Sequence, residues 1–110
     1  MKSTIYLDPE EHVLSIVIPG DLTSTTVREF NAEIETALTV PPGQAPSWKS
    51  ISLNLIAAKM VDSMGLNLIV TIFKTAQKAG AKMQVIYSDP NVHRTFVFTR
   101  LDQHVTLLKA

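Results

Sequence analysis

The sequence predicts an α/β fold, with helices packed on a mixed, mostly parallel sheet of four to five strands. The element order is ββαβαβα, followed by a last strand in the five-stranded form. Two β-branched segments lie close together near the start of the chain, and helical and strand patterns alternate after them. The length of 110 residues suits a single domain over residues 1–110. Strands that alternate with helices need crossover connections, which make the sheet largely parallel with a mixed edge.

The first two strands are predicted to form a hairpin. Residues 3–7 alternate in polarity, and residues 12–18 are rich in Val and Ile. Only residues 8–11 separate them, too few for a crossover, so the two strands should pair antiparallel. Pro19 and Gly20 end the second strand.

The first helix is predicted over residues 27–38, where apolar residues recur every three or four positions and the other face is charged. The hydroxyl residues 23–26 precede this helix and offer N-caps. The proline-rich residues 41–46 cannot continue it and form a loop. Residues 51–55 are the third strand.

The longest helix is predicted over residues 64–79, which carry a broad apolar face. Gly80 is a good C-terminal stop for that helix. A fourth strand follows over residues 82–87. This part of the chain therefore adds one helix and one strand to the predicted sheet.

A third helix is predicted to begin at Asp89 and Pro90, an N-cap followed by proline in the first helical position. Its apolar pattern runs to about Thr99. Residues 105–108 are the candidate last strand.

The composition excludes several classes of function. Acidic and basic residues number ten each, so the chain lacks the basic excess expected of a nucleic-acid-binding protein. The absence of cysteine excludes disulfides and thiolate metal sites. No apolar run approaches the roughly 20 residues that span a bilayer, and residues 1–8 lack the apolar core of a signal peptide. We therefore expect a soluble, cytoplasmic protein without a membrane span.

The most informative motif is Val-Asp-Ser-Met-Gly-Leu at residues 61–66, where the third strand gives way to the longest helix. An Asp-Ser pair at such a junction places the Ser63 hydroxyl at the exposed tip of a turn, beside the N–H groups that open a helix. Loops after the carboxyl ends of parallel strands carry ligands and partners. Ser63 is therefore well placed to be recognised or phosphorylated by another protein.

The chain resembles the STAS domain, a family found in bacterial anti-sigma factor antagonists and at the end of sulfate transporters. The Asp-Ser-x-Gly-Leu turn and the later Pro-x-Val-x-Arg helix start, at family-like spacing, are specific together. The resemblance covers nearly the whole chain. The segments that carry it are residues 19–22, 51–55, 61–66, 79–82, 88–94 and 101–102.

The resemblance implies a switch between partners that is controlled by phosphorylation. In the stand-alone antagonists the phospho-acceptor is the serine directly after the aspartate, which is Ser63 here. The dephosphorylated form would bind a serine kinase that is also an anti-sigma factor, and a PP2C-type serine phosphatase would restore that form after phosphorylation. The predicted partner surface consists of Asp21, Thr23, Ser24, Asp62, Ser63, Met64 and Gly65.

Three positions depart from the family pattern. Met64 stands where many relatives have a second Ser or Thr, and Thr23 stands where an aspartate is frequent. Both departures change the predicted recognition surface. Arg100 replaces a glycine before the Leu-Asp pair, which predicts a helix exit without positive φ because arginine is disfavoured there.

Several of these residues also have purely structural interpretations. Asp62 and Ser63 are good helix caps whether or not Ser63 is modified. Gly65 would let a second backbone come close, either that of a partner or that of the chain's own sheet. Met64 is either an adaptable contact on the surface or a core side chain.

Other functions are open to a chain of this kind. It could be a structural subunit of a transporter or of a larger signalling assembly, without phosphorylation, or a module that binds a small ligand or nucleotide in a crevice at the strand ends. A hydrolase is not expected, because Ser63 lacks the Gly-x-Ser-x-Gly context and an evident base. We predict no catalytic residues and no cofactor, and the three histidines lack the spacing of metal ligands. The oligomeric state is left open.

Overall fold

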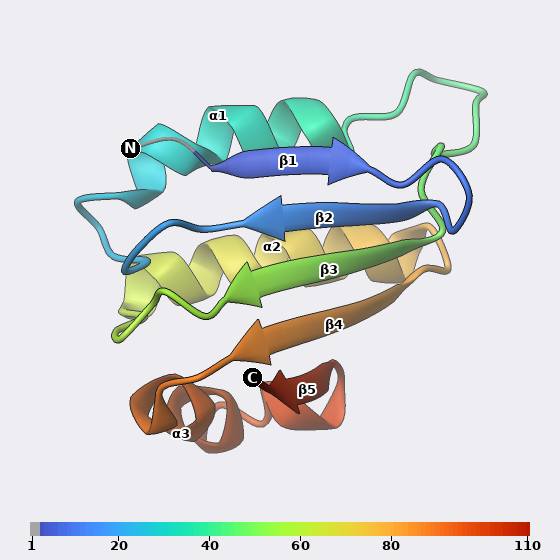
Figure 1. The fold of residues 1–110 in the computed structure, drawn as a ribbon. Coiled ribbons are helices and arrows are strands. Elements are labelled where there is room, and N and C mark those ends of the chain that lie inside the picture. Colours follow the sequence, from blue (N-terminus) through green and yellow to red (C-terminus); the bar gives the residue numbers. More distant parts are fainter. Residues whose placement is uncertain (1–2) are drawn as a thin grey trace.

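The computed structural model describes residues 3–110. The prediction that residues 1–8 lack a signal-peptide core includes Met1 and Lys2, which lie outside the described residues. The elements are β1 (Thr4–Leu7), β2 (Val13–Val17), α1 (Val27–Leu38), β3 (Ser50–Leu55), α2 (Ser63–Lys78), β4 (Lys82–Tyr87), α3 (Pro90–Phe98), the 3₁₀ turn η1 (Leu101–Gln103) and β5 (Thr106–Lys109) (Figure 1). This is the predicted order in its five-stranded form, with element ends that differ from the sequence-based bounds by one residue at most positions.

The five strands form one sheet in the order β1-β2-β3-β4-β5. β1 and β2 pair antiparallel, as predicted for a hairpin, and every other neighbouring pair is parallel. The carboxyl ends of the four parallel strands, β2 to β5, consequently meet at one edge, which we call the carboxyl edge (at the left in Figure 1). The loops that carry the predicted site leave the sheet there.

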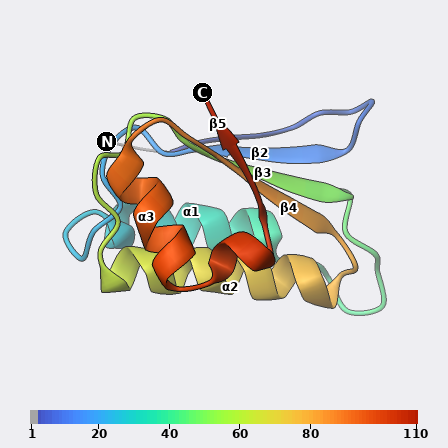
Figure 2. The same cartoon turned by 90° about the horizontal axis from the view of Figure 1, so that it is seen from below.

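Helices α1 and α2 cover one face of the sheet, and α3 lies at its β5 edge (Figure 2). Strand residues alternate between the helix-covered face and the opposite face, so every second side chain of the inner strands β2, β3 and β4 is buried. The buried core under the helices includes Leu14, Ile16, Phe30, Ile34, Trp48, Ile51, Leu53, Leu55, Ile69, Ile72, Val85 and Phe96. On the opposite face the sheet is more polar, and the Gln84 side-chain amide donates a hydrogen bond to Ser52 Oγ (3.0 Å).

All three helices begin within one residue of the predicted positions, but only α2 and α3 are capped by a side chain. Asp62 and Asp89 are the N-caps of α2 and α3, and Gly80 adopts φ +72° beyond the end of α2. Thr26, one of the predicted hydroxyl residues, is the N-cap of α1, but its side chain makes no capping hydrogen bond. The Thr26 hydroxyl instead donates to the Asp21 carbonyl (2.8 Å) and accepts from the Thr23 N–H (3.0 Å). These bonds fold the loop before α1.

Arg100 corrects one prediction. It adopts φ +63° between α3 and η1, although a helix exit without positive φ was expected there. The residues on either side explain why: Phe96 is fully buried and Leu101 is 8% exposed, so the chain must reverse sharply to bury both. Burial of a leucine contributes about 1.5–3 kcal/mol, more than the roughly 1–2 kcal/mol that a left-handed conformation costs a residue with a side chain.

Arg100→Gly is therefore expected to raise the free energy of unfolding by about 0.5–1 kcal/mol, because glycine adopts positive φ without a steric penalty. Chemical denaturation of the purified protein measures the change. Arg94→Gly is the matched control, since Arg94 is an exposed residue inside α3 and the same substitution there should lower stability by about 1 kcal/mol. Equal destabilisation by both variants would contradict the account.

Candidate functional site

Two loops at the carboxyl edge are joined to each other. Leu22 and Val61 form an isolated parallel bridge. The Leu22 N–H donates to the Met60 carbonyl (3.0 Å), and the Leu22 carbonyl accepts from the Asp62 N–H (3.1 Å). The loop before α1 and the loop before α2 therefore form one surface at the carboxyl edge.

Asp62 holds this surface together. Its Oδ1 accepts hydrogen bonds from the Met64 N–H (3.0 Å) and the Gly65 N–H (2.9 Å) in the first turn of α2. Its Oδ2 accepts from the Ser24 N–H (2.8 Å) in the neighbouring loop. The carboxylate is thus both the helix cap that the sequence predicts and a link to the loop before α1.

These bonds favour the ionised carboxylate, so they lower the pKa of Asp62 below its ordinary value of 3.8. The N–H of Gly65 makes the largest contribution, followed by that of Ser24. The Met64 N–H and the Ser24 side chain act in the same direction. Because a lowered pKa in the folded state means that folding favours the charged form, Asp62 should stabilise the fold only while it is ionised.

Replacement of Asp62 by Asn is expected to lower the melting temperature at neutral pH by roughly 3–10 °C, because the amide cannot provide the same charged acceptors. The difference from the wild type should be complete above about pH 5 and should shrink as the pH falls below 3.8 and through the lower folded-state pKa. Thermal melts of both proteins between pH 2.5 and pH 7, at about half-unit steps, test this sign. Asp8 also has a lowered pKa but is present in both proteins, so its titration cancels in the difference. A difference that stays constant with pH would contradict the role of the charge.

Asp21 has a structural role at the same edge. Its Oδ1 accepts the backbone N–H groups of Lys59 (2.7 Å) and Met60 (3.2 Å), which fixes the loop that leads to Ser63. Asp21 is predicted to belong to the partner surface, and the residue is exposed. The structure adds that one of its oxygens is already engaged within the chain.

Gly65 is the point where α2 touches the loop before α1. A Cβ atom at Gly65 would overlap the carbonyl oxygen of Leu22 and would lie 2.8 Å from its carbonyl carbon. The second backbone that the sequence analysis left unidentified is therefore the chain's own. Gly65 is buried, so its contribution to a partner surface is to place its neighbours.

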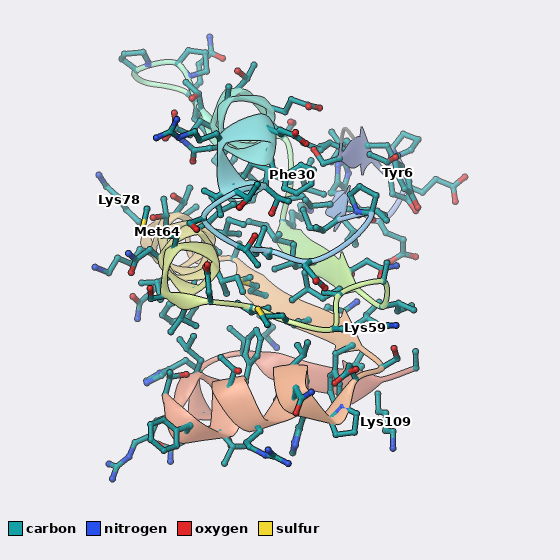
Figure 3. All side chains as sticks on the ribbon, turned by 90° about the vertical axis from the view of Figure 1, so that its left-hand side faces the viewer. Tyr6, Phe30, Lys59, Met64, Lys78 and Lys109 are labelled. Atoms are coloured by element: carbon teal, nitrogen blue, oxygen red, sulfur yellow. The ribbon has the colours of Figure 1, made fainter. Side chains whose placement is uncertain are left out.

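Ser63 and Met64 are exposed in the first turn of α2. Among residues 3–110 no hydrogen-bond partner is found for the Ser63 hydroxyl, and the residue is exposed to solvent. Met64 is 48% exposed, so it is a surface side chain and not a core side chain. Figure 3 faces the carboxyl edge and shows Met64 at α2, with Lys59 on the other side of that edge.

Sequence reasoning missed two apolar side chains on this surface. Ile56 and Met60, on the loop from β3 to α2, are 43% and 55% exposed. With Met64 they place three large apolar side chains on residues 56–64, and we call these three the apolar rim. Exposed apolar side chains that follow one another along a surface segment are typical of protein-binding surfaces, and methionines adapt to different partners. The signal in the sequence was the run of apolar residues in this loop, because a loop does not require apolar residues to form.

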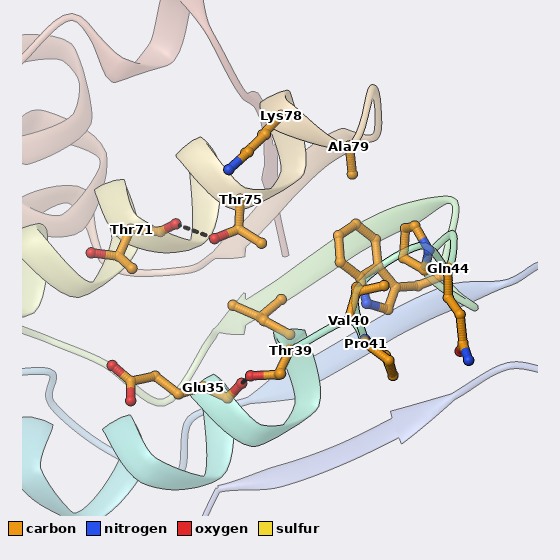
Figure 4. A pocket seen from close by; sticks show the side chains of 12 residues that line it. Glu35, Thr39, Val40, Pro41, Gln44, Thr71, Thr75, Lys78 and Ala79 are labelled. Carbon is orange, nitrogen blue, oxygen red and sulfur yellow. Dashed lines mark hydrogen bonds between the residues drawn. The ribbon is translucent and has the colours of Figure 1, made fainter.

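A cavity of about 620 Å³ lies away from Ser63 (Figure 4). Its lining combines the ends of α1 and α2 with the proline-rich loop, and includes Glu35, Val40, Trp48, Thr75 and Lys78. The crevice for a small ligand was expected at the strand ends, whereas this cavity flanks the second half of α2. Trp48 is 3% exposed, so it is a core side chain.

Residues 3–110 contain no group of three or more His, Cys, Asp or Glu side chains arranged to hold a metal ion. None of the helices in this part of the chain has both the length and the apolar character needed to cross a membrane.

Comparison with solved structures shows the same fold in anti-sigma factor antagonists. A candidate anti-sigma factor antagonist from Thermotoga maritima, TM1081, is 20% identical and superposes with a TM-score of 0.81 over 98% of this chain and 86% of its own. The anti-sigma factor antagonist SpoIIAA in its unphosphorylated form is 18% identical, with a TM-score of 0.71 over 98% of this chain and 88% of its own. A solution structure of TM1081 gives 19% identity and a TM-score of 0.71, over 96% and 79% of the two chains.

A family model covers most of the sequence. The model of the STAS domain matches residues 6–109, which include all the described helices and strands except the first two residues of β1. The expected resemblance is thereby confirmed over its full extent. The chain belongs to the STAS domain family.

Proposed function

We propose that the protein is an anti-sigma factor antagonist that binds an anti-sigma factor with serine kinase activity through its carboxyl edge, and that phosphorylation of Ser63 releases this partner. A PP2C-type serine phosphatase would return the protein to the binding form. The observation that carries the proposal is the exposed hydroxyl of Ser63, which has no hydrogen-bond partner among residues 3–110, next to the apolar rim of Ile56, Met60 and Met64. The fold that the chain shares with SpoIIAA supports the choice of partner.

The geometry favours a switch that acts on the surface. A phosphorylated serine gains about −1.5 to −2 charges and three strong acceptors. The N–H groups of Met64 and Gly65 are already bonded to Asp62, so a phosphate on Ser63 would not need to displace them and would project into solvent. The positive end of the α2 dipole tolerates the added charge. The helix would therefore persist, and the charge would act on whatever covers the apolar rim.

Mass analysis of the protein from its native host tests the proposal. Intact mass with and without phosphatase treatment, followed by peptide mapping, should show one phosphoryl group on Ser63 in part of the population. Protein captured from the same cells should carry a kinase in its unphosphorylated fraction only. A protein without phosphoryl groups under all growth conditions, or with modification only at other residues, would overturn the proposal.

A further inference from the structure

The methionines of this chain are divided between its surface and its core. Met60 and Met64 are 55% and 48% exposed, whereas Met83, in β4, is 5% exposed. The sequence contains no cysteine, and its one tryptophan, Trp48, is buried. The thioethers of Met60 and Met64 are therefore the sulfur groups that an oxidant reaches most easily among residues 3–110.

The folded backbone holds both exposed methionines at the carboxyl edge, where Figure 3 shows Met64. The Met60 carbonyl accepts a hydrogen bond from the Leu22 N–H (3.0 Å), and the Met60 N–H donates to Asp21 Oδ1 (3.2 Å). The Met64 N–H donates to Asp62 Oδ1 (3.0 Å) in the first turn of α2. These are backbone bonds, so a chemical change in either side chain need not disturb the loops that carry it.

Oxidation would change the chemical character of the apolar rim. A methionine sulfoxide is a polar, chiral side chain in place of a flexible apolar one. A partner that covers the rim would have to bury the new sulfoxide oxygens, and burial of a polar group without a hydrogen-bond partner is unfavourable. Two of the three side chains of the rim would lose their apolar character, while the core with Met83 would stay as it is.

We propose that Met60 and Met64 form a reversible oxidation site, at which a hydroperoxide converts both thioethers to sulfoxides and thereby weakens binding of the kinase partner. The effect on binding rests on the proposed function. The oxidation itself does not, because it depends only on the exposure of the two sulfur atoms. The site acts without a phosphoryl group on Ser63 and gives the carboxyl edge a second input.

The reaction transfers one oxygen atom to each methionine. The sulfur lone pair attacks one peroxide oxygen, the O–O bond breaks, and the proton of the transferred hydroxyl passes to the departing hydroxide or alkoxide. The sulfide is oxidised to a sulfoxide, and the peroxide is reduced to water or an alcohol. Methionine sulfoxide reductases, one for each epimer, reverse the change. With a dithiol as reductant, the products are the sulfide, water and a disulfide.

Treatment of the purified protein with hydrogen peroxide, followed by peptide mapping, tests the site without any partner. Met60 and Met64 should each gain one oxygen atom well before Met83 does. In urea, where the core is exposed, all three methionines should react at similar rates. Circular dichroism of the oxidised protein should superimpose on that of the untreated protein. Equal oxidation of all three methionines in the folded protein would overturn the proposed site.

Titration of the purified kinase partner tests the effect on binding. The oxidised protein should bind about ten-fold more weakly or worse, as expected for the loss of apolar contacts within an interface. Treatment with both sulfoxide reductases and a dithiol should restore the affinity. Because oxidation and binding oppose each other, the bound kinase should also slow the oxidation of Met60 and Met64.

Two double variants and a control separate the two methionines from other effects of peroxide. Leucine is apolar but has no sulfur, so peroxide should leave the affinity of Met60→Leu with Met64→Leu at its untreated value. Met60→Gln with Met64→Gln places polar groups there permanently and should bind weakly without peroxide. Phe98→Gln is the matched control, because Phe98 is 89% exposed at the end of α3 and outside the apolar rim. Its affinity should equal that of the wild type.

Two binding results would overturn the regulatory role. The oxidised protein could bind the kinase as tightly as the untreated protein does, or peroxide could still weaken binding by the double leucine variant. A kinase that binds neither the untreated nor the oxidised protein would contradict the proposed function, and the regulatory role would fail with it. The peptide maps distinguish these failures from a failure of the oxidation site itself.

Discussion

Gly65→Ala is expected to lower the free energy of unfolding by about 2–3 kcal/mol, because the added methyl group would overlap the Leu22 carbonyl oxygen. Inside a helix the same substitution normally raises stability by about 1 kcal/mol. The close backbone contact therefore reverses the sign of a substitution that helix propensity favours.

Leu22 cannot move aside to relieve this overlap. Its side chain is 1% exposed, and both of its backbone groups are bonded to the opposite loop, at Met60 and Asp62. Relief would have to come from a shift of the first turn of α2, which would stretch the bonds between Asp62 and the N–H groups of Met64 and Gly65. The substitution thus strains the helix cap as well as the packing.

Urea denaturation of the purified variant measures the change in the free energy of unfolding, and a thermal melt should show a loss of about 10 °C or more. Asn67→Ala is the matched control, since Asn67 is exposed in the same helix and its replacement should change stability by no more than about 0.5 kcal/mol. A Gly65→Ala protein as stable as the wild type would show that the two loops are not held as closely as described.

The sequence predicts the elements of this fold well because each depends on local patterns. Apolar periodicity defines α1 and α2, and an aspartate before a proline defines the start of α3. The exit from α3 could not be predicted in this way. Arg100 adopts positive φ because burial of Leu101, a contact with the rest of the fold, outweighs the local preference of arginine.

In the candidate site, too, the features that depend on local sequence were predicted and those that depend on the rest of the fold were not. The cap formed by Asp62 is local and was predicted from the sequence. Oδ2 of Asp62 and Oδ1 of Asp21 each accept a hydrogen bond from a backbone N–H group 38 residues away, and this depends on how the two loops pair at the carboxyl edge. The apolar rim escaped prediction because exposure of Ile56 and Met60 is set by the path of a loop, which has no periodicity.

Ser63→Glu should weaken binding of the kinase partner by about ten- to a hundred-fold, whereas Ser63→Ala should leave the affinity nearly unchanged. A partner that covers the apolar rim must remove water from a charge beside it, and burial of an unpaired charge is costly. Alanine adds no charge and keeps the helix start, since Asp62 provides the cap. Titration of the purified partner measures all three affinities.

Thr71→Glu is the matched control for the added charge, because Thr71 is exposed on α2 two turns beyond Ser63 and outside the predicted partner surface. Its affinity should equal that of the wild type. Circular dichroism of Ser63→Glu should superimpose on that of the wild type, and a loss of helix would show that the charge acts by unfolding α2. Equal partner recovery with Ser63→Ala and Ser63→Glu would contradict the switch.

A double-mutant cycle separates an effect through the apolar rim from simple charge repulsion at a distance. Met64→Ser alone should weaken binding, because Met64 is one of the side chains that the partner would cover. If the glutamate at position 63 acts by spoiling this apolar contact, its effect should be smaller in the Met64→Ser protein than in the wild type. Additive effects would instead indicate that long-range charge repulsion weakens binding, and added salt would then reduce the loss of affinity.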